Sequence, residues 1–164
     1  MTPAKRLFDI ALALLLGAVL LLPSALIALW LLAEDGRPVF HVSERMRAPG
    51  RPFALWKFRT MRQAAAEGGV SGGVSGGDKA ERITRAGRLL RRLRLDEIPQ
   101  LWNILKGDMS FVGPRPPLRR YVELFPGLYA RVLRSRPGLT GMATLHFRRH
   151  EERLLSRCRT AQET

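Results

Sequence analysis

Two adjacent acidic residues, Asp96 and Glu97, lie inside a strongly basic stretch of the chain. Between Lys79 and Arg120 there are eleven Lys or Arg residues and only four Asp or Glu residues. Nearby cations favour the ionised form of a carboxylate and also attract anions. A carboxylate can attack phosphorus to form an acyl phosphate while its neighbour acts as a base. The pair therefore suggests chemistry on a phosphorylated substrate, although it could also merely balance nearby arginines and cap a helix.

The acidic pair is expected at a junction between two helices. Residues 82–95 carry apolar side chains at helical spacing and arginines on the opposite face, which predicts a basic amphipathic helix. Pro99 disfavours a helical conformation at Ile98 and is well placed to begin a second helix over Pro99–Lys106. Gly107 is a suitable residue to end that helix. A helix N-terminus beside the pair would favour a bound phosphate.

Other segments are expected to form the frame around this junction. The run Val112–Pro117 contains three prolines and a glycine around Arg115, and predicts a rigid loop that presents a guanidinium to phosphate. A simple turn with an exposed arginine is the alternative. Residues 38–42 and 53–58 are prone to form strands around the turn-rich 48–52, which predicts a β-hairpin. Residues 136–141 are expected to form another tight turn.

An uncharged apolar segment, residues 10–33, precedes this basic part. Its 24 residues are enough to span a bilayer as one helix. Pro23 divides it into halves that are each too short to cross, and Ser24 could bond a carbonyl that the proline leaves free. Lys5 and Arg6 precede the segment and a basic domain follows it, so a helix that enters, bends and returns would keep both ends on the cytoplasmic side. A spanning helix and a re-entrant helix both remain open at this point.

The overall charge restricts the partners. A net charge of +14 indicates a polyanionic partner: nucleic acid, an anionic membrane surface or a phosphorylated small molecule. Aromatic residues are few and are not interleaved with the arginines, so we expect no nucleic acid. The single cysteine, Cys158, excludes an internal disulfide and fits a reducing compartment.

Three further segments have interpretations that depend on their surroundings. Residues 64–78 carry a Gly-Gly-Val-Ser repeat and are expected to form a flexible loop, either a passive linker or a mobile lid. Asp9 is expected to form an ion pair with Lys5 or Arg6 one helical turn away. Residues 145–159 are expected to form a solvated helix rich in Arg and Glu.

The chain resembles the bacterial sugar transferases, and more closely the monotopic phosphoglycosyl transferases. The longest matching run is Leu95–Pro116, which contains the acidic pair and the proline-rich loop. Shorter matches lie at Lys5–Asp9, Gly36–Phe40, Lys57–Met61, Arg82–Gly87 and Arg136–Gly141. The chain departs from the family pattern at Arg47, where a glycine is common, and at Leu22, where many relatives have serine before the proline.

The resemblance implies a specific reaction. A phospho-sugar would pass from a UDP-sugar to polyprenol (undecaprenyl) phosphate with release of UMP, initiating glycoconjugate or exopolysaccharide synthesis. Asp96 would be the nucleophile that forms a covalent phospho-sugar intermediate and would bind the required Mg²⁺, and Glu97 would be the base. The positions that match substrate-binding residues are Lys57, Arg59, Arg85, Pro114 and Arg115.

The resemblance also implies an architecture. It is an α/β fold, mainly helical with a small β-hairpin or sheet, in which residues 1–36 form a re-entrant membrane helix broken at Pro23 and Ser24. Residues 37–164 would form a catalytic domain with interfacial amphipathic helices on the cytoplasmic face of the bacterial inner membrane, in contact with lipid and possible as a homodimer. Two alternatives are a catalytically inactive truncated relative and a basic membrane-bound scaffold.

Overall fold

The computed structural model describes residues 1–62, 82–142 and 146. The predicted loop at residues 64–78 lies outside the described residues. The predicted helix at residues 145–159 also lies outside them, apart from His146. The described part is mostly helical with two small two-stranded sheets, which confirms the expected α/β class in its coarse form.

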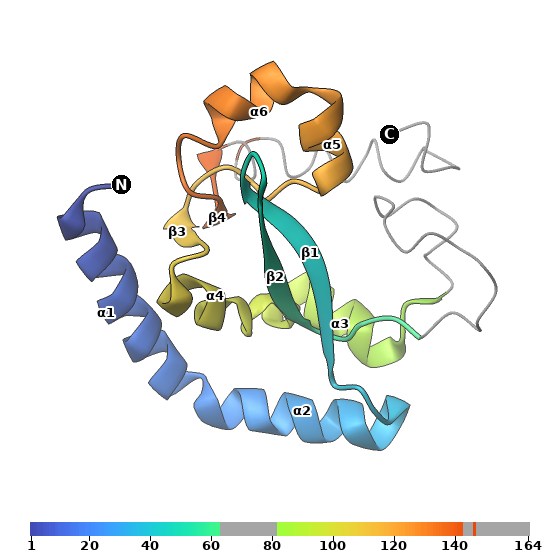
Figure 1. Cartoon of the computed structure of the whole chain (residues 1–164). Helices are drawn as coiled ribbons and strands as arrows, with labels where there is room; N and C mark the ends of the chain where they lie inside the picture. The colour runs from blue at the N-terminus through green and yellow to red at the C-terminus, as the bar shows by residue number, and fades with distance from the viewer. Residues whose placement is uncertain (63–81, 143–145, 147–164) are drawn as a thin grey trace.

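The apolar segment forms two helices joined by a sharp bend (Figure 1). Helix α1 spans Pro3–Val19 and helix α2 spans Leu21–Asp35, and the two are bent by 59°. The expected break at Pro23 and Ser24 is wrong by about one turn, because the break lies at Leu20 and both residues belong to the first turn of α2. Proline has no N–H for the carbonyl four residues earlier and clashes with it, so the hydrogen-bond ladder is interrupted ahead of Pro23.

The bent pair has an apolar surface that the rest of the protein leaves uncovered. Leu14, Leu15, Val19, Leu21 and Leu22 are each 58–71% exposed. Within the described residues, no one helix has both the length and the apolar character needed to cross a bilayer, but α1 and α2 meet those criteria as a bent pair. Exposed leucines on both sides of the bend are typical of a surface that contacts an apolar medium.

A β-hairpin follows α2 and runs past α3 and α4 toward α5 and α6 (Figure 1). Strands β1 (Phe40–Ala48) and β2 (Arg51–Phe58) pair antiparallel around Gly50, whose φ of +70° fits the turn. This confirms the predicted hairpin. Phe53 and Leu55 from β2 pack into a core with α1 and α4, and Phe58 joins a second core with α2 and α3.

The basic helix is shorter than predicted. Helix α3 spans Arg85–Leu93, begins at Thr84, whose hydroxyl accepts a bond from the Gly87 N–H, and ends at Arg94 in the left-handed conformation. Gly87 lies against the chain that follows β2, and a Cβ at this position would lie 2.1 Å from the Thr60 carbonyl oxygen. This close approach requires glycine and fixes α3 against the end of the hairpin.

The junction after α3 contains the acidic pair, as predicted. A short 3₁₀ helix, η2 (Leu95–Glu97), leads into α4 (Gln100–Lys106), which ends at Gly107. The expectation that Ile98 avoids the helical region is wrong, since its φ and ψ are −51° and −41°. Tight turns on both sides of Ile98 and its packing against the two core clusters outweigh the local effect of the proline.

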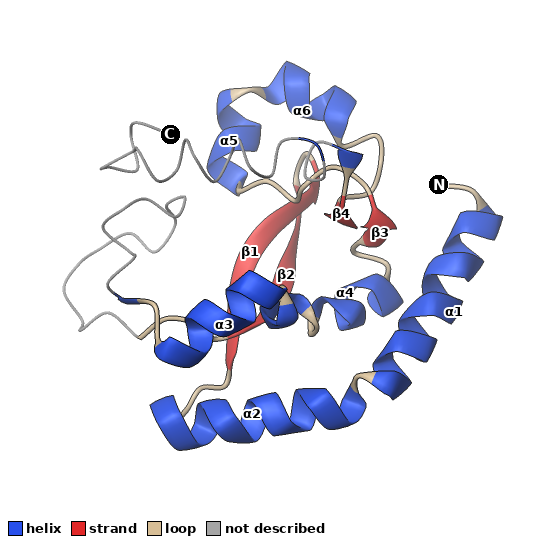
Figure 2. Cartoon of the chain, turned by 180° about the vertical axis from the view of Figure 1, so that it is seen from behind, coloured by secondary structure: helices blue, strands red, loops and turns tan. Residues whose placement is uncertain are grey.

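The last described elements form a small cap over the far end of the hairpin (Figures 1 and 2). Strand β3 (Ser110–Val112) pairs parallel with β4 (Gly138–Thr140), and helices α5 (Arg119–Leu124) and α6 (Pro126–Val132) lie between them in sequence. The tight turn expected at residues 136–141 is therefore wrong, because Gly138–Thr140 gains a strand partner that is distant in sequence.

Candidate active site

Glu97 is held by two cations. The Lys57 Nζ lies 2.9 Å from Glu97 Oε1, and an Arg94 terminal nitrogen lies 3.3 Å from the same oxygen. Lys57 comes from β2, whereas Arg94 ends α3, so the contact joins the hairpin to the helix junction. Fixed cations beside a carboxylate leave an electropositive surface that suits a phosphorylated ligand.

Asp96 has a different environment. It is 7% exposed, and its Oδ1 is buried without a hydrogen-bond partner among the described residues. Burial raises its pKa above the ordinary value, and Glu97 adds to the rise, while Lys57, Arg91 and Arg94 oppose it. The cations therefore do not set the direction of the pKa shift at Asp96, because desolvation exceeds their attraction. A carboxylate of raised pKa is the more basic and more nucleophilic once it is deprotonated.

A pocket opens beside the acidic pair. Its polar lining comes from four elements or their connecting loops: Arg45, Lys57, Arg94, Glu97, Gln100 and Arg115. Leu55, Pro116 and Leu139 form an apolar part of the wall. The proline-rich loop thus brings Arg115 to the pocket that Glu97 lines, as its rigid flanks predicted. Asp96 itself lies just below this surface.

A buried amide fixes the junction to the hairpin. Asn103 on α4 is fully buried, and its Oδ1 accepts a bond of 3.1 Å from the Trp56 N–H. Its Nδ2 donates to the Ala54 carbonyl at 2.7 Å. A matched pair of bonds to the backbone of β2 sets the position of α4, and hence of the acidic pair before it, relative to Lys57.

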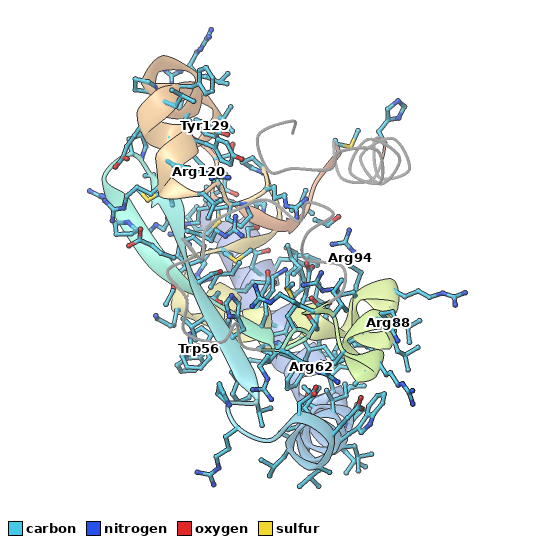
Figure 3. The ribbon with its side chains drawn as sticks, turned by 90° about the vertical axis from the view of Figure 1, so that its right-hand side faces the viewer. Trp56, Arg62, Arg88, Arg94, Arg120 and Tyr129 are labelled. Carbon is cyan, nitrogen blue, oxygen red and sulfur yellow. The ribbon has the colours of Figure 1, made fainter. Side chains whose placement is uncertain are left out.

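The connection after β2 positions α3 in a similar way. The Arg91 Nε donates to the Thr60 hydroxyl at 2.8 Å, and the Thr84 N–H donates to the Thr60 carbonyl at 3.2 Å. Figure 3 shows Arg88 and Arg94 on the α3 side of the molecule and Trp56 on the hairpin. The acidic pair therefore lies where two separately anchored helices meet one strand.

Three of the expected substrate-binding residues lie in other settings. Arg59 is 7% exposed and donates three bonds of 2.7–3.0 Å to the carbonyls of Asp35, Gly36 and Arg37, which follow or end α2. Arg85 is exposed at the start of α3. Pro114 contributes its carbonyl to the Gly138 N–H at 2.8 Å. None of the three is in the lining of this pocket, and their substrate-binding roles stay predictions.

The predicted ion pair of Asp9 is part of a larger buried network. Lys5 Nζ lies 3.3 Å from an Asp9 oxygen, which confirms the pair. Asp9 is also fully buried and accepts a 2.8 Å bond from the Ser110 hydroxyl and a longer one from the Phe111 N–H. Arg6 pairs elsewhere, with the carbonyls of Ile104 and Leu105. Sequence separation hid these contacts, since they join α1 to residues about one hundred positions away.

The acidic side chains near the pocket determine whether a divalent metal ion could bind there. Within the described ranges, no group of three or more His, Cys, Asp or Glu side chains converges to hold a metal ion. Asp96 and Glu97 nevertheless fit Mg²⁺, which is commonly bound by one or two carboxylates together with substrate phosphates and water. The unpartnered Asp96 Oδ1 is the atom whose hydrogen-bonding capacity is unused.

The pocket includes residues that the sequence analysis missed, Arg45 above all. The pairing of the hairpin strands contains the information that identifies Arg45. Partners in an antiparallel register share one face, and the register pairs His41 with Lys57, Ser43 with Leu55 and Arg45 with Phe53. Alternation from Lys57 therefore places Arg45 on the pocket face as soon as the register is known. His41 lies opposite Lys57, and burial, Lys57 and the nearby arginines lower its pKa.

Comparison with known proteins identifies the family of this chain. A family model described as bacterial sugar transferase matches residues 1–162. The chain belongs to the bacterial sugar transferase family. Membership covers the bent helix pair as well as the pocket, so both are parts of one family architecture.

Individual relatives give the range of activities that members of the family are named for. The uncharacterised sugar transferase EpsL of Bacillus subtilis is 40% identical over 148 residues, which cover 88% of this chain and 69% of the relative. A UDP-glucose:undecaprenyl-phosphate glucose-1-phosphate transferase of Caulobacter vibrioides is 39% identical over 142 residues, 85% of this chain and 52% of the relative. A UDP-N-acetylgalactosamine-undecaprenyl-phosphate N-acetylgalactosaminephosphotransferase of Aeromonas hydrophila is 38% identical over 115 residues, 67% of this chain and 26% of the relative.

Proposed function

We propose that this protein transfers a sugar phosphate from a UDP-sugar to undecaprenyl phosphate, releasing UMP, through a covalent intermediate on Asp96. The observation that supports this most directly is a buried carboxylate with an unpartnered oxygen, next to a second carboxylate held by two cations, beside a basic pocket. The names of the relatives supply the donor and acceptor classes. The different sugars in those names leave the sugar of this chain open.

In the first step, an Asp96 carboxylate oxygen attacks the phosphorus that carries the sugar. The bond from that phosphorus to the bridging oxygen breaks, and the bridging oxygen leaves with its electron pair as part of UMP. The product on the protein is an acyl phosphate that bears the sugar. Lys57 and Arg115, both in the pocket lining, offset the negative charge that collects on the phosphate oxygens.

In the second step, a phosphate oxygen of undecaprenyl phosphate attacks the same phosphorus. The bond to Asp96 breaks and the carboxylate returns, so the product is an undecaprenyl diphosphate sugar. Glu97 accepts the proton when the acceptor phosphate carries one. The ion pairs of Glu97 with Lys57 and Arg94 hold that carboxylate at the pocket wall, where it can meet the acceptor.

Mg²⁺ is part of the proposal. Asp96 and Glu97 would hold it together with the diphosphate of the donor, and when bound it would supply charge neutralisation on the phosphate oxygens. The protein groups that share this role are Lys57 and Arg115. Removal of Mg²⁺ with a chelator is therefore expected to stop turnover, and addition of Mg²⁺ to restore it.

We further propose that α1 and α2 form a re-entrant membrane anchor on the cytoplasmic face of the bacterial inner membrane. The 59° bend, the exposed leucines around it and the cations at both ends support an anchor that enters and leaves on one side. A lipid acceptor would then be presented at the same surface that anchors the protein.

The reaction is tested by UMP release from a panel of UDP-sugars in nanodiscs, with and without undecaprenyl phosphate. The full chain and Asp96→Asn are compared. Mass spectrometry of the wild type incubated with donor alone is expected to show one added sugar phosphate, absent in Asp96→Asn. A basic scaffold or an inactive relative would instead give no UMP with any donor, and that result would refute the transferase proposal.

The anchor is tested by labelling from one side of the membrane. Thr2→Cys and Arg37→Cys are made separately in a Cys158→Ser background. A membrane-impermeant maleimide applied to inverted vesicles is expected to label both cysteines. Labelling of Arg37→Cys alone would mean that the bent pair crosses the bilayer.

A further inference from the structure

Arg45 is a pocket cation with hydrogen-bonding capacity to spare within the described part of the chain. It lies on β1, partly buried, and its Nε is buried without a partner among the described residues. The hydrogen bond of its side chain within this part is a long one, 3.4 Å from a terminal nitrogen to the Pro116 carbonyl. A guanidinium has five N–H donors, so most of the capacity of Arg45 is available.

The two arginines with structural roles provide a contrast. Arg59 places its terminal nitrogens 2.7–3.0 Å from three backbone carbonyls, and Arg6 places its own 2.6 and 2.7 Å from two. Arg59 binds carbonyls at the C-terminal end of α2, and Arg6 binds carbonyls at the C-terminal end of α4, both through short bonds. Among the described residues, Arg45 caps no helix end and has no comparable set of carbonyl acceptors for its terminal nitrogens. Its terminal nitrogens are therefore better placed to bind a ligand than those of Arg6 and Arg59, although Arg59 Nε is also buried without a partner in this part of the chain.

The electrostatic setting of Arg45 favours an anion. Its pKa is lowered first by burial and then by Arg115, a second cation that lines the same pocket. Arg45 is partly buried and Arg115 is exposed. Two guanidiniums near one another repel, and the burial of Arg45 weakens the screening by water, so a negative charge between them is favoured. A phosphate group is the anion that matches their planar, forked geometry.

The hairpin places Arg45 at a distance from the point of attack. Lys57, which holds Glu97, lies opposite His41 in the register, and Arg45 lies four residues further along β1. Four residues of strand correspond to about 13 Å. This is a backbone separation, and the long side chains of Lys57 and Arg45 both reach the lining of one pocket, so a diphosphate whose reacting phosphorus is near Lys57 can place its second phosphate toward Arg45. In the donor, the part beyond the reacting phosphorus is the nucleotide that leaves.

We infer that Arg45, together with Arg115, binds the phosphate of the departing nucleoside monophosphate. This inference rests on the proposed transferase function and deepens it by assigning the leaving group to a particular end of the pocket. When Asp96 attacks the phosphorus that carries the sugar, negative charge accumulates on the bridging oxygen and the leaving phosphate. The Arg45 guanidinium beside the leaving phosphate stabilises this charge, and it therefore assists the first half-reaction without contacting the lipid acceptor.

The test is UMP binding to the full chain in nanodiscs, measured by calorimetry. We expect Arg45→Ala to weaken UMP binding at least tenfold, and Arg45→Lys to recover only part of the loss because an ammonium keeps the charge but not the fork. Arg51→Ala is the matched control, since Arg51 is an exposed cation of the same hairpin outside the pocket, and its UMP affinity should be unchanged.

Kinetics give a second readout. Arg45→Ala should lower kcat/KM for the UDP-sugar ten- to a hundredfold and leave the KM for undecaprenyl phosphate within twofold. Melting temperatures of all three variants establish that they are folded. If wild type binds UMP and folded Arg45→Ala binds it equally well, the assignment of Arg45 is overturned while the transferase stands. A rise confined to the acceptor KM also overturns it. Wild type that binds no UMP would refute the proposed function itself.

Discussion

The anchor region and the pocket region bury charge in opposite ways. The anchor region is α1 and α2 with the contacts of Arg6, Asp9 and Arg59. There, Asp9 accepts bonds from Ser110 and Phe111 in addition to its ion pair, and the two arginines donate short bonds to carbonyls at helix ends. The pocket region is the polar lining described above together with Asp96.

In the pocket region, key donors and acceptors lack partners. Asp96 Oδ1 and Arg45 Nε are buried without one among the described residues, whereas Glu97 has two cations on a single oxygen. An unmatched buried polar group costs about 1–3 kcal/mol. In the anchor region, Asp35 Oδ2 and Arg59 Nε are also buried without a partner within the described ranges. The difference therefore lies in the remaining charged atoms, which bond backbone carbonyls at helix ends in the anchor region and line a pocket in the pocket region.

Changing Asp96 to Asn is expected to give the largest effect in this comparison. Loss of the nucleophile should reduce UMP turnover at least about a thousandfold, because the covalent route is removed. Single-turnover UMP release in nanodiscs measures this. A variant that retains even a tenth of the wild-type rate would exclude Asp96 as the nucleophile.

The same variant should be the more stable protein at neutral pH. The pKa of Asp96 is raised in the folded state, so the folded protein holds this proton more tightly than the unfolded chain does. Stability is therefore lost as the pH rises through the interval from the unfolded pKa to the folded pKa, and stays reduced above it. Melting curves should show Asp96→Asn above wild type at pH 7 and no difference at a pH below both values. A lower melting temperature at pH 7 would contradict the predicted cost.

Changing Lys57 to Met is expected to have the next largest effect, on turnover rather than on folding. It leaves Glu97 with Arg94 alone and removes a cation from the pocket. A fall in kcat/KM of about a hundredfold or more is expected from the loss of one electrostatic stabiliser. Arg51→Met, which removes a cation from the start of the same strand, should leave turnover unchanged. Equal losses in the two variants would mean that only overall charge matters.

Changing Arg59 to Ala should act on the anchor instead. Three carbonyls at the end of α2 lose their donor, and the expected loss of stability is about 2–3 kcal/mol. Arg59→Lys should recover little, since one ammonium cannot reproduce the fork. Limited proteolysis and thermal melts follow the loss, and kcat of the folded fraction should be unchanged. A raised KM for the donor with normal stability would restore Arg59 as a substrate contact.

The smallest effect is expected at the exposed contact between Glu44 and Arg119. Two bonds of 2.7 and 3.1 Å join them, but both side chains are in water. Exposed ion pairs are screened and contribute little. Glu44→Gln should change neither the melting temperature nor UMP turnover measurably. A clear loss of turnover would extend the functional region beyond the pocket.

Local sequence rules were sufficient where one segment decides its own structure. The strand-prone runs and Gly50 specified the hairpin, and Gly107 ended α4. The proline-rich loop, predicted to present Arg115, carries it into the pocket lining. The acidic pair was recognisable as chemistry because two carboxylates in a basic stretch are unusual. The resemblance to the family then identified the reaction class, and the comparisons confirmed the family.

Local rules were insufficient where a distant segment intervenes. Gly138–Thr140 became a strand because β3 offered a partner. The contacts of Arg59 were likewise hidden, because only the tertiary structure brings the end of α2 beside it with three acceptors. Pro23 is a different case, since it predicted a break whose place lies one turn earlier, at the carbonyl that loses its partner.

The sequence by itself determined two features of this protein, which are an apolar segment that must bend and a pair of carboxylates among cations. Composition and proline placement encode both, because they act within a few residues. Only the tertiary structure decided which charges are satisfied. It buried Asp96 far enough that desolvation, together with Glu97, outweighs the three nearby cations in setting its pKa. It also turned Arg45 toward the pocket while enclosing Arg59 in backbone carbonyls. Burial and partners depend on contacts between distant segments, and those contacts are absent from any local pattern.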